Sequence, residues 1–526
     1  MMLPCQDWKT PEVCVSALWK KIPRYIRLTY AAAVVLGLSV HLYMFTNKFT
    51  NHDDLNQMFY ADYGTASGRW LLPSVLRLDG NISIPWLIGL LSILCLAGTA
   101  CLTVALFRIR RPFGCIVTAA LLVAFPAVTA TFGYMFSADA YFLSLLLAVF
   151  GAYAAVKWGW RGSVLATISI TLSLCIYQSY LPAAVVLMAG ALLFDTLDGT
   201  HSLQALLLKG LRLAATLVAA LTAYLLSVRL TTQRLGIGLT DYEGISDMGK
   251  ISLKELPHLV FLSYRKYFSF FLENDWKCHF DFLKYAFFMT ALGAAALGIL
   301  LLLLRRLGVG RSALALVLAA IYPLAGGLIY VMVPNGYVHI HMLYGLVYIL
   351  IMPVALAEYA EPYLEKSGAQ PFYAVVSWVT LLTMALASYS YAVTDNNAYM
   401  KADLAMRQCT AYSNRLLERV ETCAGYEPGM NVVLVGSTIR EDELTPTPEA
   451  NTAHLVGIFD FGNLRTFFTY REFLRIYLGF TNPVYPGDSA MAQEFAAMEQ
   501  VQAMPLYPRA DSIQVIDGAV IVKLND

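Results

Sequence analysis

The chain has 526 residues, of which 58% are hydrophobic and only 14% are charged. Soluble domains contain roughly 45–50% apolar and about 25% charged residues, so this composition excludes a soluble enzyme. Lys and Arg number 37 against 36 Asp and Glu, for a net charge of +1, which gives no basic field of the kind that attracts nucleic acid. The nine cysteines include no Cys-x-x-Cys pair, so they predict neither a zinc site nor a disulfide framework.

Long apolar segments recur along the chain, and a helix of about 20 such residues crosses roughly 30 Å of hydrocarbon. We predict about eleven membrane-spanning helices on this criterion. They are Tyr25–Phe45, Pro85–Phe107, Phe113–Thr131, Ala138–Val156, Ser163–Tyr177, Leu181–Phe194, Leu208–Leu230, Tyr285–Leu304, Ser312–Val333, His341–Ala357 and Pro371–Val393. The fifth and sixth are short, so with the polar turn between them they predict either a tight hairpin or a re-entrant segment.

Basic residues gather in alternate short loops, beginning with the segment before the first span. The positive-inside rule then predicts a multi-pass membrane protein with a cytoplasmic amino terminus. The long loops 46–84 and 231–284 are expected on the extracytoplasmic face. About 24 polar residues precede the first span, which favours an uncleaved anchor over a signal peptide.

The composition changes at about Asp395, where acidic, amide, Gly and Pro residues return. We therefore divide the chain into a transmembrane domain, residues 1–394, and a small C-terminal extracytoplasmic α/β domain, residues 395–526. Within the second domain a helix is expected over roughly Asn397–Cys423. The apolar runs Asn431–Val435 and Gly518–Leu524 predict strands.

Adjacent carboxylates, Asp53 and Asp54, open the first long loop. At a membrane surface either one can accept the proton of an attacking hydroxyl group, and Asp62 shares a helical face with Asp54. The alternative is a solvated helix in which Asp53 or Asp54 caps the first turn. The same two carboxylates are the ligands if a divalent metal is used, but adjacent side chains point in different directions, so we expect no required cofactor.

Cations next to aromatic residues are the candidates for binding a phosphate. Arg69 precedes Trp70 in the first long loop, and Arg265 and Lys266 lie between tyrosines in the second. A fixed cation beside an interfacial ring suits a lipid phosphate. The alternatives are a snorkelling arginine with an interfacial tryptophan, and an ordinary amphipathic helix at the membrane surface.

Two further segments carry polar groups on the same face. His339 and His341 can contact phosphate, although residues two apart do not share a helical face, so we expect no paired metal site there; the alternative is a pair facing water. Tyr177, Gln178 and Tyr180 form an aromatic turn that can hydrogen-bond and stack on a sugar. The alternative there is a turn satisfied by neighbouring helices.

These segments together resemble a known family. A first span is followed by Asn51-His-Asp-Asp54, then by Gly68-Arg-Trp70 and by the turn Tyr177-Gln-Ser-Tyr180, and the chain closes with Met504–Pro508 and Asp517–Lys523. This arrangement resembles the Gtr-type bacterial glucosyltransferases that modify O-antigen, members of the GT-C superfamily of polytopic membrane glycosyltransferases. The resemblance covers most of the membrane part, and it implies a polytopic α-helical, GT-C-like fold in the bacterial plasma (inner) membrane.

The resemblance also implies a reaction. The donor is a polyprenyl-phosphate-linked hexose, usually undecaprenyl-phosphate glucose, and the acceptor is an envelope polysaccharide or a teichoic-acid-like glycan. An acidic residue of the first outer loop acts as the base, which maps onto Asp53 or Asp54 and gives inversion. The donor phosphate is then assigned to Arg69, Arg265, Lys266, His339 and His341, and the sugar or acceptor to Asp62, Trp70, Tyr177, Gln178 and Tyr180.

Three alternatives stay open at this point. One is a polyprenyl-phosphate-mannose-type transferase that acts on protein or lipid. Another is a flippase for lipid-linked glycans, which would need charged residues around a midplane cavity and internal pseudo-symmetry. The last is a non-catalytic envelope scaffold.

Overall fold

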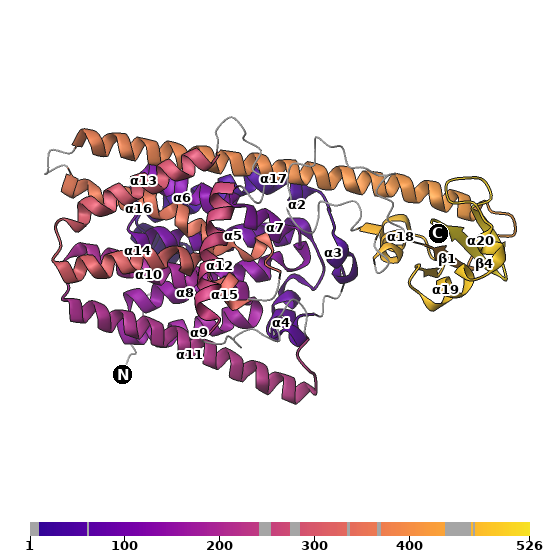
Figure 1. Ribbon diagram of the computed structural model, residues 1–526, viewed down its shortest axis with the longest axis horizontal. Coiled ribbons are helices and arrows are strands. Elements are labelled where there is room, and N and C mark those ends of the chain that lie inside the picture. Colours follow the sequence, from indigo (N-terminus) through magenta and orange to yellow (C-terminus); the bar gives the residue numbers. More distant parts are fainter. Residues whose placement is uncertain are drawn as a thin grey trace.

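The computed structural model describes residues 10–59, 63–240, 254–273, 285–333, 337–364, 370–436, 464–465 and 469–525. Long helices form a bundle, and a small lobe with a sheet lies beyond one end of it (Figure 1). Nine helices of the described residues are long and apolar enough to cross a membrane, and a bent pair makes a tenth. The predicted polytopic helical membrane protein is confirmed.

The nine long helices follow the hydropathy closely. They are α2 (Arg24–Thr46), α5 (Pro85–Phe107), α8 (Ala138–Lys157), α9 (Gly159–Ile176), α10 (Leu181–Asp198), α11 (Leu203–Leu235), α14 (Val309–Gly326), α16 (Val347–Leu364) and α17 (Gln370–Glu421). The predicted span Tyr285–Leu304 coincides with helix α13. Its part Ala291–Leu304 is apolar but shorter than the 18 residues required of a candidate span. The predicted spans therefore coincide with helices, except that Ser312–Val333 is divided between α14 and α15 (Ile329–Met332), His341–Ala357 begins in two 3-10 turns before α16, and Phe113–Thr131 is broken.

The predicted span Phe113–Thr131 is broken into α6 (Pro112–Ala124) and α7 (Pro126–Phe132). Pro126 disfavours helical geometry at the preceding residue, and Phe125 accordingly has extended torsion angles of φ −63° and ψ 135°. The two helices meet at a bend of 40°. The break turns α7 toward η8 (Ile340–Met342), which it contacts.

The two spans that we predicted to be short are not short. Helices α9 and α10 each have 18 residues, because α9 begins before the apolar run and α10 continues to Asp198. A buried 3-10 turn, η4 (Gln178–Tyr180), joins them. Of the two alternatives, the chain adopts the tight hairpin, and its polar turn is enclosed by protein.

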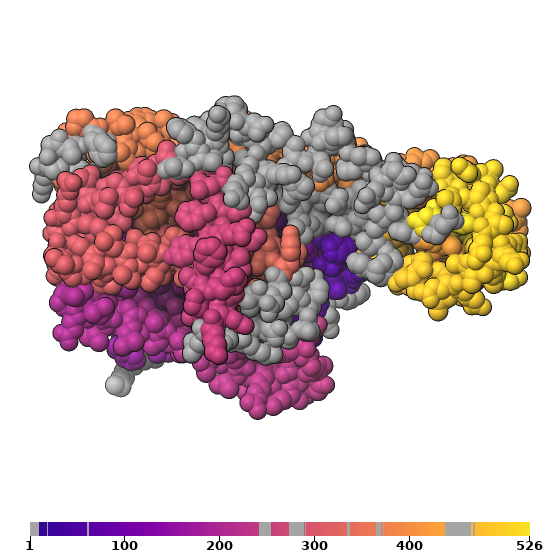
Figure 2. All heavy atoms as spheres, viewed as in Figure 1, coloured from indigo at the N-terminus to yellow at the C-terminus, as the bar shows by residue number. Residues whose placement is uncertain are grey.

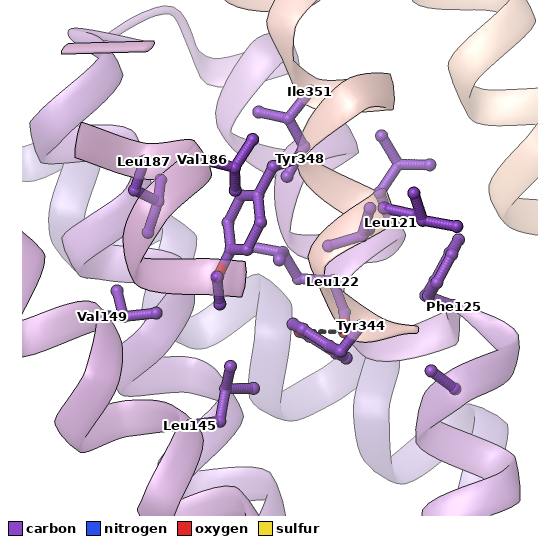
Figure 3. Close-up of a cluster of buried hydrophobic side chains, with 14 of the residues drawn as sticks. Leu121, Leu122, Phe125, Leu145, Val149, Val186, Leu187, Tyr344, Tyr348 and Ile351 are labelled. Atoms are coloured by element: carbon purple, nitrogen blue, oxygen red, sulfur yellow. Dashed lines mark hydrogen bonds between the residues drawn. The ribbon is translucent and has the colours of Figure 1, made fainter. Parts of the chain in front are cut away.

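A continuous apolar core fills the bundle between α6, α8, α10 and α16. Figure 3 shows its central side chains: Leu121, Leu122, Phe125, Leu145, Val149, Val186, Leu187, Tyr344, Tyr348 and Ile351. The Tyr344 hydroxyl donates a hydrogen bond of 2.8 Å to the Leu122 carbonyl, which satisfies a polar atom that would otherwise be costly to bury. This packing gives the end of the bundle near η4 and η8 a rigid support.

Short elements connect the long helices. They are α1 (Pro11–Lys21), α3 (His52–Gln57), η1 (Thr65–Ser67), α4 (Leu72–Leu76), η2 (Arg77–Asp79), η3 (Met135–Ser137), α12 (Leu256–Phe268), η6 (Ser269–Glu273), α15 (Ile329–Met332) and η9 (Tyr344–Leu346). Several of them line the candidate site.

Helix α17 runs without a break for 52 residues, about 78 Å at 1.5 Å per residue. We predicted two helices here, Pro371–Val393 and Asn397–Cys423. The stretch contains no glycine, and no proline after Pro371, so nothing in it stops the helix. The composition change at Asp395 therefore lies inside one helix, which passes along the bundle and into the lobe (Figure 1).

The lobe contains a four-stranded sheet in the order β2-β1-β4-β3. Its strands are β1 (Asn431–Val435), β2 (Val484–Tyr485), β3 (Ile513–Ile516) and β4 (Ala519–Lys523). Strand β1 is parallel to both β2 and β4, whereas β3 and β4 form an antiparallel hairpin. The hairpin turns through Asp517 and Gly518, both at positive φ, as an Asp-Gly turn requires. Helices α18 (Tyr470–Leu478), α19 (Ala490–Ala496) and α20 (Glu499–Gln502) complete the described lobe.

Candidate active site

A polar cavity of about 420 Å³ lies where α3, η1, η3, η4 and η8 meet. It is lined by His52, Asp53, Gln57, Tyr63, Ser67, Arg69, Tyr134, Phe136, Tyr141, Tyr177, Gln178, Ser179, Val333, Tyr337, His339, His341 and Met342. Pockets for small molecules have roughly this volume. Among the described lining residues Asp53 is the one carboxylate, and Arg69 is the one Lys or Arg side chain.

Helix α3 separates the two adjacent carboxylates. Asp53 and Gln57, four residues apart and therefore on one helical face, line the cavity. The Asp53 side chain is 48% exposed, and its Oδ1 lies 3.6 Å from His52 Nε2. Asp54 is one residue further along the helix, is fully buried, and does not line the cavity.

Asp54 is instead surrounded by hydrogen-bond donors. Its Oδ2 accepts from Lys48 Nζ at 2.5 Å and from Thr50 Oγ1 at 2.7 Å, and its Oδ1 accepts from Ser83 Oγ at 2.5 Å. Asn51 Oδ1 caps the helix by accepting from the Asp54 backbone N–H at 2.7 Å. These contacts join three segments of the chain, and Asp54 is buried outside the cavity, where a substrate hydroxyl group does not reach it.

Arg69 lines the cavity, and its side chain contacts aromatic and amide groups. Its guanidinium carbon is 4.9 Å from the centre of the Tyr177 ring, its Nη1 donates to the Tyr141 hydroxyl at 3.1 Å, and its Nε donates to Gln178 Oε1 at 3.3 Å. Tyr141 stacks on Tyr177 with ring centres 4.1 Å apart. No carboxylate of the described residues forms an ion pair with Arg69, so within the described part of the chain its charge is not neutralised.

Gln178 fixes the loop that carries Arg69. Its Nε2 donates to the Ser67 carbonyl at 2.9 Å and to the Tyr224 hydroxyl at 2.8 Å. Gly68, between Ser67 and Arg69, has a φ of +76°, and a Cβ there would lie 2.6 Å from the Tyr224 hydroxyl. The loop therefore needs glycine at this position, both for its torsion angle and for the close approach of Tyr224.

The two histidines also meet in the cavity. The rings of His339 and His341 are stacked with centres 5.5 Å apart, and His341 lies 6.1 Å from the Tyr177 ring. Burial lowers the pKa of His341 to about 3, and the charges of His339 and Arg69 act in the same direction. His341 is therefore neutral, and its buried Nδ1 has no hydrogen-bond partner among the residues described.

The structure thus brings six predicted residues to one cavity: Asp53, Arg69, Tyr177, Gln178, His339 and His341. Other predicted residues lie elsewhere. Trp70 turns toward α11, where its Nε1 donates to Ser227 Oγ at 3.0 Å. Tyr180 is fully buried behind Tyr177. Arg265 and Lys266 are exposed on α12 and do not line the cavity, and Asp62 lies outside the described residues.

Several cavity residues were not among the predicted site residues, although His52 and Ser179 lie inside motifs noted in the sequence. They are His52, Gln57, Tyr63, Ser67, Tyr134, Phe136, Tyr141, Ser179, Val333, Tyr337 and Met342. Four of them are tyrosines, and the chain contains 32 tyrosines, so composition alone does not say which tyrosines meet. Within the described ranges no three His, Cys, Asp or Glu side chains gather closely enough to hold a metal ion.

A second cavity, of about 380 Å³, lies within the bundle and is apolar. Its walls come from α10, α12, η6, α13, α14 and α16, with side chains such as Leu193, Phe271, Met289, Leu300 and Ile349. Tyr267 and Tyr322 contribute the hydroxyl groups among its lining residues. Such walls suit a hydrocarbon chain better than a polar ligand.

The long apolar helices and the polar cavity at one end of the bundle define a polytopic membrane protein with a site of small-molecule size. The sequence pattern of a family described as Glucosyl transferase GtrII matches residues 42–352. This match covers more than half of the chain, so the protein belongs to that family, and the resemblance to Gtr-type glucosyltransferases is confirmed. The matched segment includes every residue that lines the polar cavity. No curated protein and no solved structure matches the chain.

Proposed function

We propose that this protein transfers glucose from a polyprenyl-phosphate-linked donor to a hydroxyl group of a cell-envelope glycan. The reaction takes place on the extracytoplasmic face of a bacterial plasma membrane, the amino terminus is cytoplasmic, and the enzyme is of the GT-C class. Family membership indicates glucosyltransferase activity. The observation that carries the rest is that one carboxylate, Asp53, and one cation, Arg69, line the same cavity.

Arg69 supports an anionic donor. Its guanidinium is partly enclosed beneath Tyr177 and makes no ion pair with a described carboxylate, so a phosphate in the cavity supplies the missing negative charge. The buried Nδ1 of His341 lacks a partner within the described chain. A neutral imidazole can donate a hydrogen bond to a phosphate or sugar oxygen without adding a second charge.

The reaction assigned to this cavity is a single displacement. Asp53 accepts the proton of the acceptor hydroxyl while the hydroxyl oxygen forms a bond to the anomeric carbon of glucose. The bond between that carbon and the phosphate oxygen breaks, and the electron pair leaves with polyprenyl phosphate, whose charge Arg69 stabilises. One displacement at the anomeric carbon inverts its configuration. No cofactor enters these steps.

The apolar cavity supports a donor with a hydrocarbon tail. Its lining side chains come from α10, α14 and α16, which are long and apolar enough to lie in a bilayer, and also from α12, η6 and the shorter apolar helix α13. A polyprenyl chain that enters from the membrane meets no polar surface there except two tyrosine hydroxyls among the described lining residues. A water-soluble nucleotide sugar has no hydrocarbon tail to bind in the apolar cavity.

The test is a donor panel with protein purified in detergent. Polyprenyl-phosphate glucose and polyprenyl-phosphate mannose are supplied with an envelope glycan acceptor, with and without a chelator. We expect release of polyprenyl phosphate from the glucose donor, inverted configuration in the product, and no effect of the chelator. Asp53→Asn should lower transfer by about 100-fold or more. Arg265→Gln, on an exposed helix face away from the cavity, is the matched control and should transfer normally.

The alternatives give different outcomes. If polyprenyl phosphate is released from the mannose donor alone, the transferred sugar is mannose and not glucose. Movement of the lipid-linked sugar across vesicle membranes without cleavage, equally fast in Asp53→Asn, would identify a flippase. Full transfer by Asp53→Asn would remove Asp53 as the base.

A further inference from the structure

Helix α3 has two functional sides. His52, Asp53 and Gln57 line the polar cavity. Asp54 and Leu55 lie on the opposite side and are buried, with exposed fractions of 0% and 2%. The helix has only six residues, too few to be stable without tertiary contacts. The position of Asp53 therefore depends on what holds the buried side.

The C-terminal lobe holds one part of that side. Leu55 belongs to a buried apolar cluster whose other described members all lie between Ala405 and Leu524. Several come from α18, namely Tyr470, Phe473 and Leu474. Helices α3 and α18 contact each other directly, and α3 lies beside the lobe in Figure 1. In Figure 2 an indigo segment, from early in the chain, is visible next to the yellow lobe.

The membrane bundle holds the other part. Asp54 joins α3 to Lys48, just after α2, and to Ser83, just before α5. The lobe reaches this part of α3 too, because Tyr477 of α18 packs against the apolar cluster that contains Leu55, the residue next to Asp54. Burial raises the pKa of Tyr477, and the negative charge of Asp54 raises it further. Bundle and lobe therefore meet at α3, from which Asp53 faces the cavity.

We propose that the C-terminal lobe is a working part of the active site, and that Leu55 and Tyr477 are positioning residues that hold α3 so that Asp53 faces the acceptor hydroxyl. This inference rests on the proposed role of Asp53 as the base. The groups assigned to the donor phosphate, Arg69 and His341, lie on other segments. Loosening the contact between α3 and the lobe should therefore impair the chemical step and spare donor binding.

The experiment measures kcat and the KM for polyprenyl-phosphate glucose with full-length protein. Leu55→Ala removes the side chain that enters the core of the lobe, and we expect kcat to fall roughly tenfold or more, as for a small misplacement of a reacting group. The donor KM should change by less than about twofold. Leu55→Met keeps an apolar side chain of similar volume and should restore most of kcat.

The matched control lies in the same lobe but in a different cluster. Phe495 is buried with residues such as Val433 and Ile521, and this cluster does not include Leu55. Phe495→Ala should lower the melting temperature of the protein as Leu55→Ala does, but leave kcat nearly unchanged. A second positioning variant, Tyr477→Ala, changes a partly exposed side chain and decides the question if Leu55→Ala does not fold.

The outcomes separate this inference from the proposed function. Full activity of Asp53→Asn would overturn the base assignment whatever the lobe does. If Asp53→Asn is inactive but Leu55→Ala and Tyr477→Ala keep wild-type kcat, the lobe does not position α3. Equal losses in Phe495→Ala and Leu55→Ala, or a donor KM that rises in step with the fall in kcat, would also overturn the inference.

Discussion

The guanidinium of Arg69 lies 4.9 Å from the centre of the Tyr177 ring, although the two residues belong to a surface loop and to the turn of a distant helical hairpin. Tyr141 stacks on the Tyr177 ring with ring centres 4.1 Å apart, and its hydroxyl group accepts a hydrogen bond of 3.1 Å from Arg69 Nη1. A planar cation that contacts one ring of a stacked pair and donates a hydrogen bond to the hydroxyl group of the other ring has little freedom to rotate. Its hydrogen-bonding edge is therefore organised before any donor arrives.

The first prediction concerns this contact. Arg69→Lys keeps the charge but loses the planar group that stacks on Tyr177, so we expect the donor KM to rise by about 2–30-fold. Arg69→Gln should raise it further, since the charge is lost as well. Steady-state kinetics with a range of donor concentrations measures both. Lys266→Gln, on an exposed face of α12, removes a cation outside the cavity, and an equal rise in KM there would contradict the assignment.

The second prediction concerns Gly68. An alanine there must adopt a φ of +76° and brings its Cβ to 2.6 Å from the Tyr224 hydroxyl, so the loop that carries Arg69 should move. We expect Gly68→Ala to lower kcat/KM for the donor by about tenfold or more. Gly80→Ala is the control, because Gly80 has a φ of +85° but open space within 4 Å of the point where a Cβ would lie. Comparable losses in both variants would mean that backbone strain alone is responsible.

The third prediction is that substitutions of Asp53 and Asp54 have different effects on the stability of the protein. Asp54→Asn leaves Lys48 without its anionic partner, and breaking a buried ion pair costs about 3 kcal/mol or more. Asp53 is 48% exposed, so Asp53→Asn should leave the free energy of unfolding nearly unchanged while transfer is lost. Denaturant unfolding in detergent measures the difference. Equal stability of the two variants would argue against the buried role of Asp54.

The fourth prediction is a pH dependence of stability. The pKa of His341 is lowered from 6.5 to about 3, so the unfolded chain binds a proton between these values that the folded protein does not. Stability from this residue is complete above pH 6.5 and declines as the pH falls toward 3. Between roughly pH 7 and pH 5 the loss is about 2 kcal/mol, and His341→Gln should remove it. Identical pH slopes for wild type and variant would show that His341 is not buried as a neutral group.

The sequence was sufficient for the membrane helices, because hydropathy reports directly on which segments leave water. It also identified Asp53, Arg69, Tyr177, Gln178, His339 and His341 as candidates. It did not decide between Asp53 and Asp54, since neighbours on a helix point about 100° apart. The choice depends on Lys48 and Ser83, which fix the buried side of α3 only in the folded protein.

The candidates that lie outside the polar cavity have a similar explanation. Trp70 and Tyr180 follow or flank residues of the cavity, but each is directed to another helix by its own neighbours, Ser227 in one case and Tyr344 in the other. Tyr63 and Tyr141 were missed because their hydroxyl groups meet at 3.3 Å only after distant segments pack. Composition and spacing identify which residue types are present, and tertiary packing selects among them.

The length of the uninterrupted helix α17 sets both the distance and the rotation of the lobe relative to α3. Each residue added to a helix turns the segment beyond it by about 100° and lifts that segment by about 1.5 Å, so one inserted residue would swing the lobe away from α3. About seven inserted residues, two helical turns, would return the lobe to its present orientation about the helix axis but would move it about 10 Å further along that axis. In both cases Leu55 leaves the core that now encloses it. The length of this helix is thus as much a determinant of the active site as the chemistry of its side chains.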